Sequence, residues 1–76
     1  MKVYFKNIWG ERRVIAEIQS ENEMGKVISD FIAQCNAKKP AGAKPFVSYY
    51  TRSWETEDGL IQYDVGSHTE FFFLEK

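Results

Sequence analysis

The chain opens with an alternation of apolar and polar residues that is typical of a β-strand. Residues 2–8 are rich in β-branched and aromatic side chains, residues 12–18 repeat the alternation, and a turn that contains Gly10 separates them. In the second segment Val14, Ala16 and Ile18 share one face. Two such segments joined by a short turn predict an N-terminal hairpin.

The clearest signal in the chain is a helix that begins at Ser20. Ser20 and Glu23 fit the capping box, in which each side chain accepts a hydrogen bond from a backbone N–H of the first turn. The apolar residues that follow have the i, i+3, i+4 spacing of one helical face: Met24, Val27, Ile28, Phe31, Ile32 and Cys35. Asn36 is a suitable C-cap, and the following residues, up to Pro45, predict an exposed loop.

The second half of the chain returns to β patterning. We expect strands over residues 46–54, 60–65 and 69–74, separated by turns at Asp58-Gly59 and Gly66-Ser67. Strands joined by tight turns are antiparallel neighbours. The order ββαβββ predicts an α+β fold in which one helix packs on a mostly antiparallel five-stranded sheet. Since no repeat or second core is visible, we expect residues 1–76 to form a single domain.

One helix covers only one face of such a sheet, so the other face should be polar in a plain monomer. The alternation leaves neither face cleanly polar, because the chain contains six Phe, four Tyr and two Trp residues. We expect some of these rings to lie away from the helix: Tyr4, Tyr49, Tyr50, Trp54 and one or two of Phe71 to Phe73. They either cover one another across strands or bind another molecule.

Composition narrows the classes of function. Ten basic and eleven acidic residues give a net charge of −1, which lacks the basic footprint of a general nucleic-acid binder but leaves a local basic patch open. The single cysteine, Cys35, excludes an intramolecular disulfide and a cysteine-based zinc site, and we expect it to be buried. We see neither a signal peptide nor an apolar run of about 20 residues, and therefore expect a cytoplasmic protein.

The densest polar cluster runs from Asp64 to Glu70 and holds the only histidine, His68. Asp64, Ser67 and His68 nominally match a nucleophilic triad, but neighbouring residues in a tight turn point to opposite sides. Asp64, His68 and Glu70 offer three metal ligands if Asp64 lies across the turn. The simplest interpretation is that Asp64, Ser67 and Thr69 hydrogen-bond the turn backbone, with His68 at its edge. We expect no cofactor.

The segment from Tyr49 to Trp54 interleaves aromatic residues with Arg52. Such a composition suits stacking on single-stranded nucleic acid, although one arginine beside the acidic residues 55–58 makes a weak basic site. It is also typical of a hot spot for protein binding.

Several motifs in the chain are shared with other small proteins. They are Tyr49-Tyr50-Thr51-Arg52, the Trp54 and Asp58-Gly59 that follow, Tyr63-Asp64-Val65-Gly66-Ser67-His68-Thr69-Glu70-Phe71-Phe72, and Tyr4-Phe5-Lys6-Asn7-Ile8 with Gly10-Glu11. In these motifs the chain resembles small uncharacterised proteins encoded by phages and conjugative elements of Gram-positive and gut bacteria, with Lys38 to Lys44 as a local insertion. The resemblance implies a genomic setting in which small proteins often bind host or defence proteins, as anti-CRISPR-like inhibitors do.

Three hypotheses follow. The leading one is a non-enzymatic protein-interaction module of a phage or mobile element that binds a host or defence protein, or a second copy of itself. Its expected contact residues are Tyr50, Arg52, Trp54, Asp64, Ser67, His68 and Glu70. The first alternative is a nucleic-acid-binding accessory protein whose basic contacts are Arg12, Arg13, Lys38, Lys39 and Lys44. The second is a metal-dependent enzyme at Asp64, His68 and Glu70.

Overall fold

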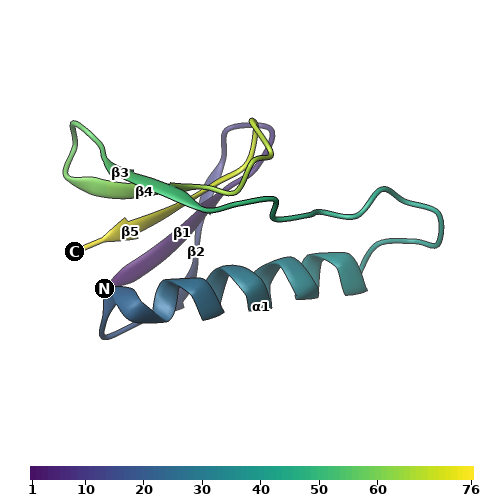
Figure 1. Ribbon diagram of the computed structural model, residues 1–76, viewed down its shortest axis with the longest axis horizontal. Helices are drawn as coiled ribbons and strands as arrows, with labels where there is room; N and C mark the ends of the chain where they lie inside the picture. The colour runs from purple at the N-terminus through teal and green to yellow at the C-terminus, as the bar shows by residue number, and fades with distance from the viewer.

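The computed structural model, which describes residues 1–76, has one helix packed against one face of a five-stranded antiparallel sheet (Figure 1). Strands β1 (Lys2–Lys6) and β2 (Arg12–Glu17) form the N-terminal hairpin. Strands β3 (Arg52–Glu55), β4 (Leu60–Asp64) and β5 (Phe71–Glu75) form the C-terminal meander. The strand order is β2-β1-β5-β4-β3, so the pairing of β1 with β5 joins the two halves. The predicted α+β fold and element order are confirmed.

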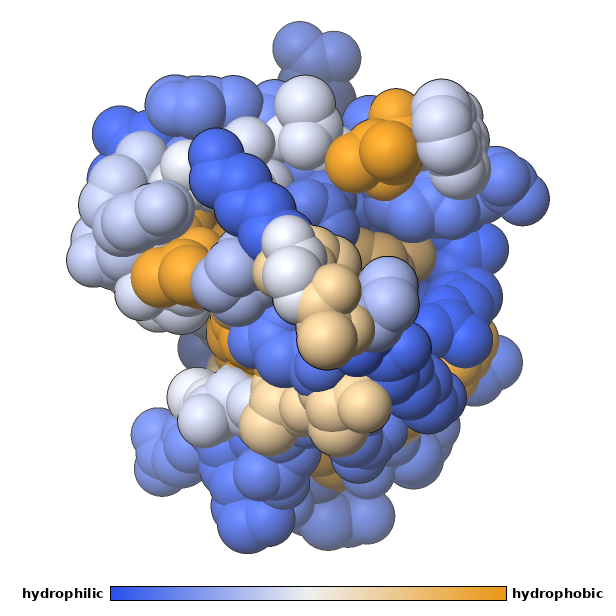
Figure 2. All heavy atoms as spheres, turned by 90° about the vertical axis from the view of Figure 1, so that its right-hand side faces the viewer, coloured by the Kyte–Doolittle hydropathy of each residue, from blue (hydrophilic) through white to orange (hydrophobic).

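The helix α1 (Met24–Ala37) runs along the sheet, and the loop that follows it projects beyond the strands (Figure 1). Residues 38–45 are all exposed, and within them Lys39 Nζ donates a hydrogen bond to the Lys44 carbonyl at 2.9 Å. Figure 2 views the molecule from this end and shows a mostly hydrophilic surface on which hydrophobic residues lie in separate places. With 14 residues, α1 is not long and apolar enough to cross a membrane.

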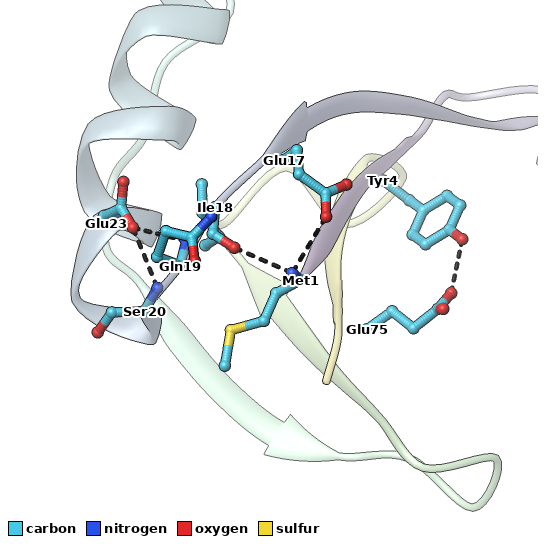
Figure 3. Close-up of polar contacts among 8 residues, drawn as sticks. All are labelled: Met1, Tyr4, Glu17, Ile18, Gln19, Ser20, Glu23 and Glu75. Atoms are coloured by element: carbon cyan, nitrogen blue, oxygen red, sulfur yellow. Dashed lines mark hydrogen bonds and ion pairs between the residues drawn. The ribbon is translucent and has the colours of Figure 1, made fainter.

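The start of the helix is stabilised as the sequence predicts. A 3₁₀ turn, η1 (Glu21–Glu23), leads into α1 and is closed by the capping box. The Glu23 carboxylate accepts hydrogen bonds from the backbone N–H groups of Gln19 and Ser20 at 2.8 and 3.0 Å (Figure 3). The Ser20 hydroxyl in turn accepts from the Asn22 N–H at 3.3 Å. These bonds satisfy backbone donors that the first turn of any helix leaves free.

The core lies between α1 and the sheet. Its most deeply buried members are Val3 of β1 and Phe72 and Leu74 of β5, each 0 % exposed. Around Phe72, the rings of Phe5, Phe31 and Phe46 pack with centroid separations from 4.5 to 6.5 Å in mostly tilted or edge-on arrangements. Such arrangements add to the hydrophobic gain from burial because the positive ring edge meets a negative ring face.

The predicted strand over residues 46–54 is wrong in its first part, since only Arg52–Glu55 is paired as a strand. Strand β4 ends at Asp64, so residues 46–51 have no strand to extend alongside; one hydrogen bond, from the Tyr49 N–H to the Val65 carbonyl at 3.0 Å, is their link to that neighbour. Phe46 instead inserts into the core. The last strand likewise begins at residue 71 rather than 69, because residues 65–70 form an irregular turn.

Two helix residues differ from expectation. Asn36 is not the C-cap, because α1 continues to Ala37. Its side chain instead holds the backbone of Phe46: Nδ2 donates to the Phe46 carbonyl at 2.9 Å, and Oδ1 accepts from the Phe46 N–H at 2.8 Å. Cys35 packs against the core but is only half-buried.

Candidate functional site

The strand register defines which side chains lie on the sheet face away from the helix. Tyr4 pairs with Val14 on one side and Phe73 on the other, Phe73 pairs with Gln62, and Gln62 pairs with Trp54. Directly paired residues point to the same face, so these five side chains form a row across all five strands. We call the surface that carries this row the open face. The expectation that aromatic rings lie away from the helix is confirmed for Tyr4, Phe73 and Trp54.

The row is covered in its centre and exposed at its two edges. Phe73 is only 3 % exposed although it lies outside the core cluster under α1. Its cover is the guanidinium of Arg12, which lies 4.2 Å from the ring centroid and makes a cation–π contact. Val14 and Trp54, on the two edge strands, are 52 % and 43 % exposed. The open face therefore offers apolar contact area chiefly at its margins.

A second row of the open face contains Arg52 and Asp64, and Tyr50 lies beside it, so three of the predicted site residues come together. Arg52 pairs with Asp64, and Asp64 pairs with Phe71. Arg52 Nη2 donates to Asp64 Oδ2 at 2.7 Å, while the Gly66 N–H donates to Asp64 Oδ1 at 2.8 Å. Both bonds stabilise the carboxylate and lower the pKa of Asp64. The Arg52 guanidinium also lies 5.1 Å from the Tyr50 ring centroid, so Tyr50, Arg52 and Asp64 form one cluster.

Within this cluster the three residues have different roles. Asp64 is 4 % exposed, which leaves it no surface with which to contact a partner. Its carboxylate instead fixes the direction of the Arg52 side chain, which is 64 % exposed. Tyr50, at 42 % exposure, lies beside the guanidinium. Tyr50 and Arg52 are thus available for contact, and Asp64 positions them.

The basic side chains of the open face are less well paired than the acidic ones. Lys2, Lys6 and Arg12 form no ion pair with a carboxylate. By contrast, Glu75 accepts a hydrogen bond from the Tyr4 hydroxyl at 2.6 Å, which raises the pKa of Tyr4 (Figure 3). Glu17 likewise lies 3.3 Å from the Met1 ammonium group (Figure 3). The open face therefore carries both signs: in the strand register Lys2 lies between Glu17 and Glu75, whereas Lys6 and Arg12 have no carboxylate partner.

The turn from Val65 to Glu70 is held by Ser67. The Ser67 hydroxyl accepts hydrogen bonds from the N–H groups of Thr69 and Glu70 at 3.3 and 2.8 Å, and donates to the Glu70 carbonyl at 3.2 Å. His68 has a φ of 67°, in the left-handed region, so the chain turns sharply at this residue. The interpretation that side chains hydrogen-bond the turn backbone is confirmed for Asp64 and Ser67. It is wrong for Thr69, which takes part only through its backbone N–H.

The chemistry considered for this turn does not assemble. No hydrogen bond links His68 to Ser67 or to Asp64, and the Ser67 hydroxyl and Asp64 carboxylate are both engaged elsewhere. No group of three or more His, Cys, Asp or Glu side chains lies close enough to hold a metal ion. Asp64, His68 and Glu70 are therefore neighbours in sequence that form neither a triad nor a ligand set.

One exposed feature was missed by sequence reasoning, the turn between β1 and β2. Trp9 at its tip is 77 % exposed, and the adjacent Ile8 is 54 % exposed. The Asn7 side-chain oxygen accepts from the N–H groups of Trp9 and Glu11 at 2.9 and 3.0 Å, and Gly10 supplies a φ of 84°. The turn is thus ordered and displays an indole. The sequence signal that could have revealed this exposed ring is a tryptophan at the tip of a hairpin with short strands.

No known protein family, curated protein or solved structure matches this chain.

Proposed function

We propose that this protein is a non-enzymatic interaction module that binds a partner protein through its open face. The observation that carries the proposal is that α1 covers one face of the sheet only, which leaves Val14 and Trp54 exposed at the two edges of the other face. The resemblance of its motifs to proteins of phages and conjugative elements supports a host or defence protein as the partner, and inhibition of that protein as the result.

The strongest anchors are the exposed aromatic and arginine side chains. Trp54 lies on the edge strand β3, Trp9 projects from the β1–β2 turn, and Arg52 is held in place by Asp64. Tryptophan, tyrosine and arginine are enriched among the few residues that dominate the binding energy of protein interfaces. Ordering these groups before binding also lowers the entropic cost of association.

Charge favours an acidic partner over a second copy of the chain. On the open face Lys6 and Arg12 are cross-strand neighbours without a carboxylate partner. Two copies that met with this pair of cations at the symmetry axis would bring like charges together, which is unfavourable. A partner with an acidic surface around an apolar patch would pair these cations and cover the margins of the row.

The test is affinity capture from a lysate of the bacterial host, followed by titration of the purified partner. We expect Trp54→Ala to weaken binding about 30-fold or more, as for an interface hot spot. Lys6→Glu should weaken it further in low salt, because it replaces attraction by repulsion. Val47→Ala, which removes an equally exposed apolar side chain outside the open face, should leave binding unchanged.

Two results would count against the proposal. One is a partner whose affinity is the same for wild-type protein and for Trp54→Ala and Lys6→Glu. The other is light scattering that shows a dimer in solution which Trp54→Ala converts to a monomer, since the open face would then be used for self-association.

A further inference from the structure

The basic residues of this molecule are unevenly distributed. The strand register places Lys6, Arg12 and Arg52 in the row next to the β1–β2 turn. The β1–β2 turn lies about midway along the molecule, and the last turn of α1 and the loop after it extend beyond it (Figure 1). We call the part of the molecule from this row to the loop the basic end. This basic end holds seven of the ten basic residues of the chain: Lys6, Arg12, Arg13, Lys38, Lys39, Lys44 and Arg52. It holds three of the eleven acidic residues: Glu11, Asp64 and Glu70.

The opposite end is correspondingly acidic. It contains the start of the helix and the β3–β4 turn, with Glu17, Glu21, Glu23, Glu55, Glu57, Asp58 and Glu75. Of the few cations there, Lys76 lies 3.3 Å from Glu55 and 4.0 Å from Glu21. The net charge of −1 therefore conceals a local basic patch.

Four cations of the basic end lie away from the open face and have no carboxylate partner: Arg13, Lys38, Lys39 and Lys44. The Arg13 guanidinium lies over the Phe31 ring of α1, at 5.5 Å. Burial raises the pKa of the Cys35 thiol, and Glu70 acts in the same direction, while Arg13, Lys38 and Lys39 lower it. Three cations and one carboxylate thus act on the last turn of the helix. Cations at a helix C-terminus also stabilise the helix.

An exposed ring lies in a groove at the same end. The groove, of about 250 Å³, runs between residues 44–49 and the turn that follows β4, and Lys44 and Tyr49 line it. Tyr49 is 71 % exposed, yet its backbone N–H is held by the hydrogen bond to the Val65 carbonyl at 3.0 Å. Glu70 is the single acidic side chain in the groove.

We propose that the basic end binds single-stranded nucleic acid, with phosphates on Arg13, Lys38, Lys39 and Lys44 and one base stacked on Tyr49. A single strand presents phosphates and free base faces together, which matches an aromatic ring set among cations. A duplex hides its base faces within the stack, and an acidic protein surface does not carry a free planar base beside each of its anionic groups. This surface lies apart from Val14 and Trp54, so the activity goes beyond the proposed protein interaction.

The direct test is fluorescence anisotropy of the intact protein with a labelled 20-mer of deoxythymidine. Four phosphate contacts on a single strand predict a slope of about −2.8 for the logarithm of affinity against the logarithm of salt concentration. Raising the salt from about 50 to about 200 mM should therefore weaken binding about 50-fold. Absence of binding at the lower salt concentration would overturn the proposal.

Matched variants locate the contact. The pair Lys38→Glu with Lys39→Glu should abolish binding, whereas Lys2→Glu with Lys76→Glu makes the same change in net charge at the acidic end and should retain most of it. Tyr49→Ala should weaken binding about 10-fold, as for the loss of one stacked base. Trp54→Ala should bind as wild type, which separates this activity from partner binding through the open face.

Three results would refute the inference. They are equal loss in the two double-lysine variants, tighter binding of a duplex of the same length, and competition by poly-glutamate as effective as competition by unlabelled oligonucleotide. The last result would show a general anion-binding surface suited to an acidic protein. Circular dichroism melts of both double variants distinguish lost contacts from lost fold.

Discussion

Replacing Asn36 by alanine should destabilise the protein by about 2 kcal/mol. The Asn36 side chain makes two hydrogen bonds to the backbone of Phe46, at 2.8 and 2.9 Å, and Phe46 is only 7 % exposed. Removing one partner of such bonds leaves a backbone N–H and a C=O unsatisfied, at about 1–1.5 kcal/mol each. Alanine returns about 0.6 kcal/mol through its higher helix propensity. For a domain of this size, the expected fall in Tm is about 10 °C.

Thermal and urea unfolding followed by circular dichroism measure this effect, with two variants as references. Gln34→Ala changes an exposed residue of the same helix that makes no hydrogen bond, and should leave Tm almost unchanged. Asn36→Asp keeps an acceptor for the Phe46 N–H but loses the donor to its carbonyl, so it should fall between wild type and Asn36→Ala. If Asn36→Ala melts within about 2 °C of Gln34→Ala, the two hydrogen bonds contribute no net stability and the reasoning is wrong.

Two further predictions concern the cluster at the end of β4. The ion pair with Arg52 lowers the pKa of Asp64 in the folded state. The stability that this pair contributes to the fold is therefore complete above the unfolded pKa of about 3.9, and it is lost as pH falls through the lower folded pKa. Urea midpoints between pH 7 and pH 2 should therefore fall more steeply for wild type than for Asp64→Asn; parallel curves would contradict this. Gly66 has a φ of 94°, and a Cβ added at this residue would lie 3.1 Å from Tyr50 Cε2. Gly59 has a similar φ of 83°, but no atom lies within 4 Å of the position where its Cβ would be. Gly66→Ala should therefore lower Tm clearly more than Gly59→Ala, and equal losses would mean that Tyr50 moves aside freely.

Local signals predicted the helix and the turns well. The capping box at Ser20 and the apolar series from Met24 depend on residues within a few positions of one another, and the structure keeps both. The pairing of β1 with β5 joins segments about 70 residues apart, for example Lys2 with Glu75, and no local pattern specifies it. The composition of the open face follows from that register, so only its aromatic character was predictable.

The alternation over residues 46–54 was misleading because propensity and pairing disagree there. Aromatic and β-branched residues favour extended backbone, but a strand also needs a neighbour, and β4 turns away after Asp64. Phe46 gains more from insertion among the core rings than from a place in the sheet. The ion pair between Arg52 and Asp64 was not predicted either. These two side chains meet only because of the β3–β4 register, which no local pattern in the sequence specifies.

Net charge proved a poor guide because it sums over a surface that other molecules meet one side at a time. With a calculated isoelectric point near 5.8, this chain is expected to pass a cation exchanger at neutral pH. Because the basic and acidic residues are unevenly distributed over the molecule, it also has an electric dipole. It can adhere to resins of either sign by rotating the appropriate pole toward the beads, and it approaches any charged body in a preferred orientation before a single contact has formed.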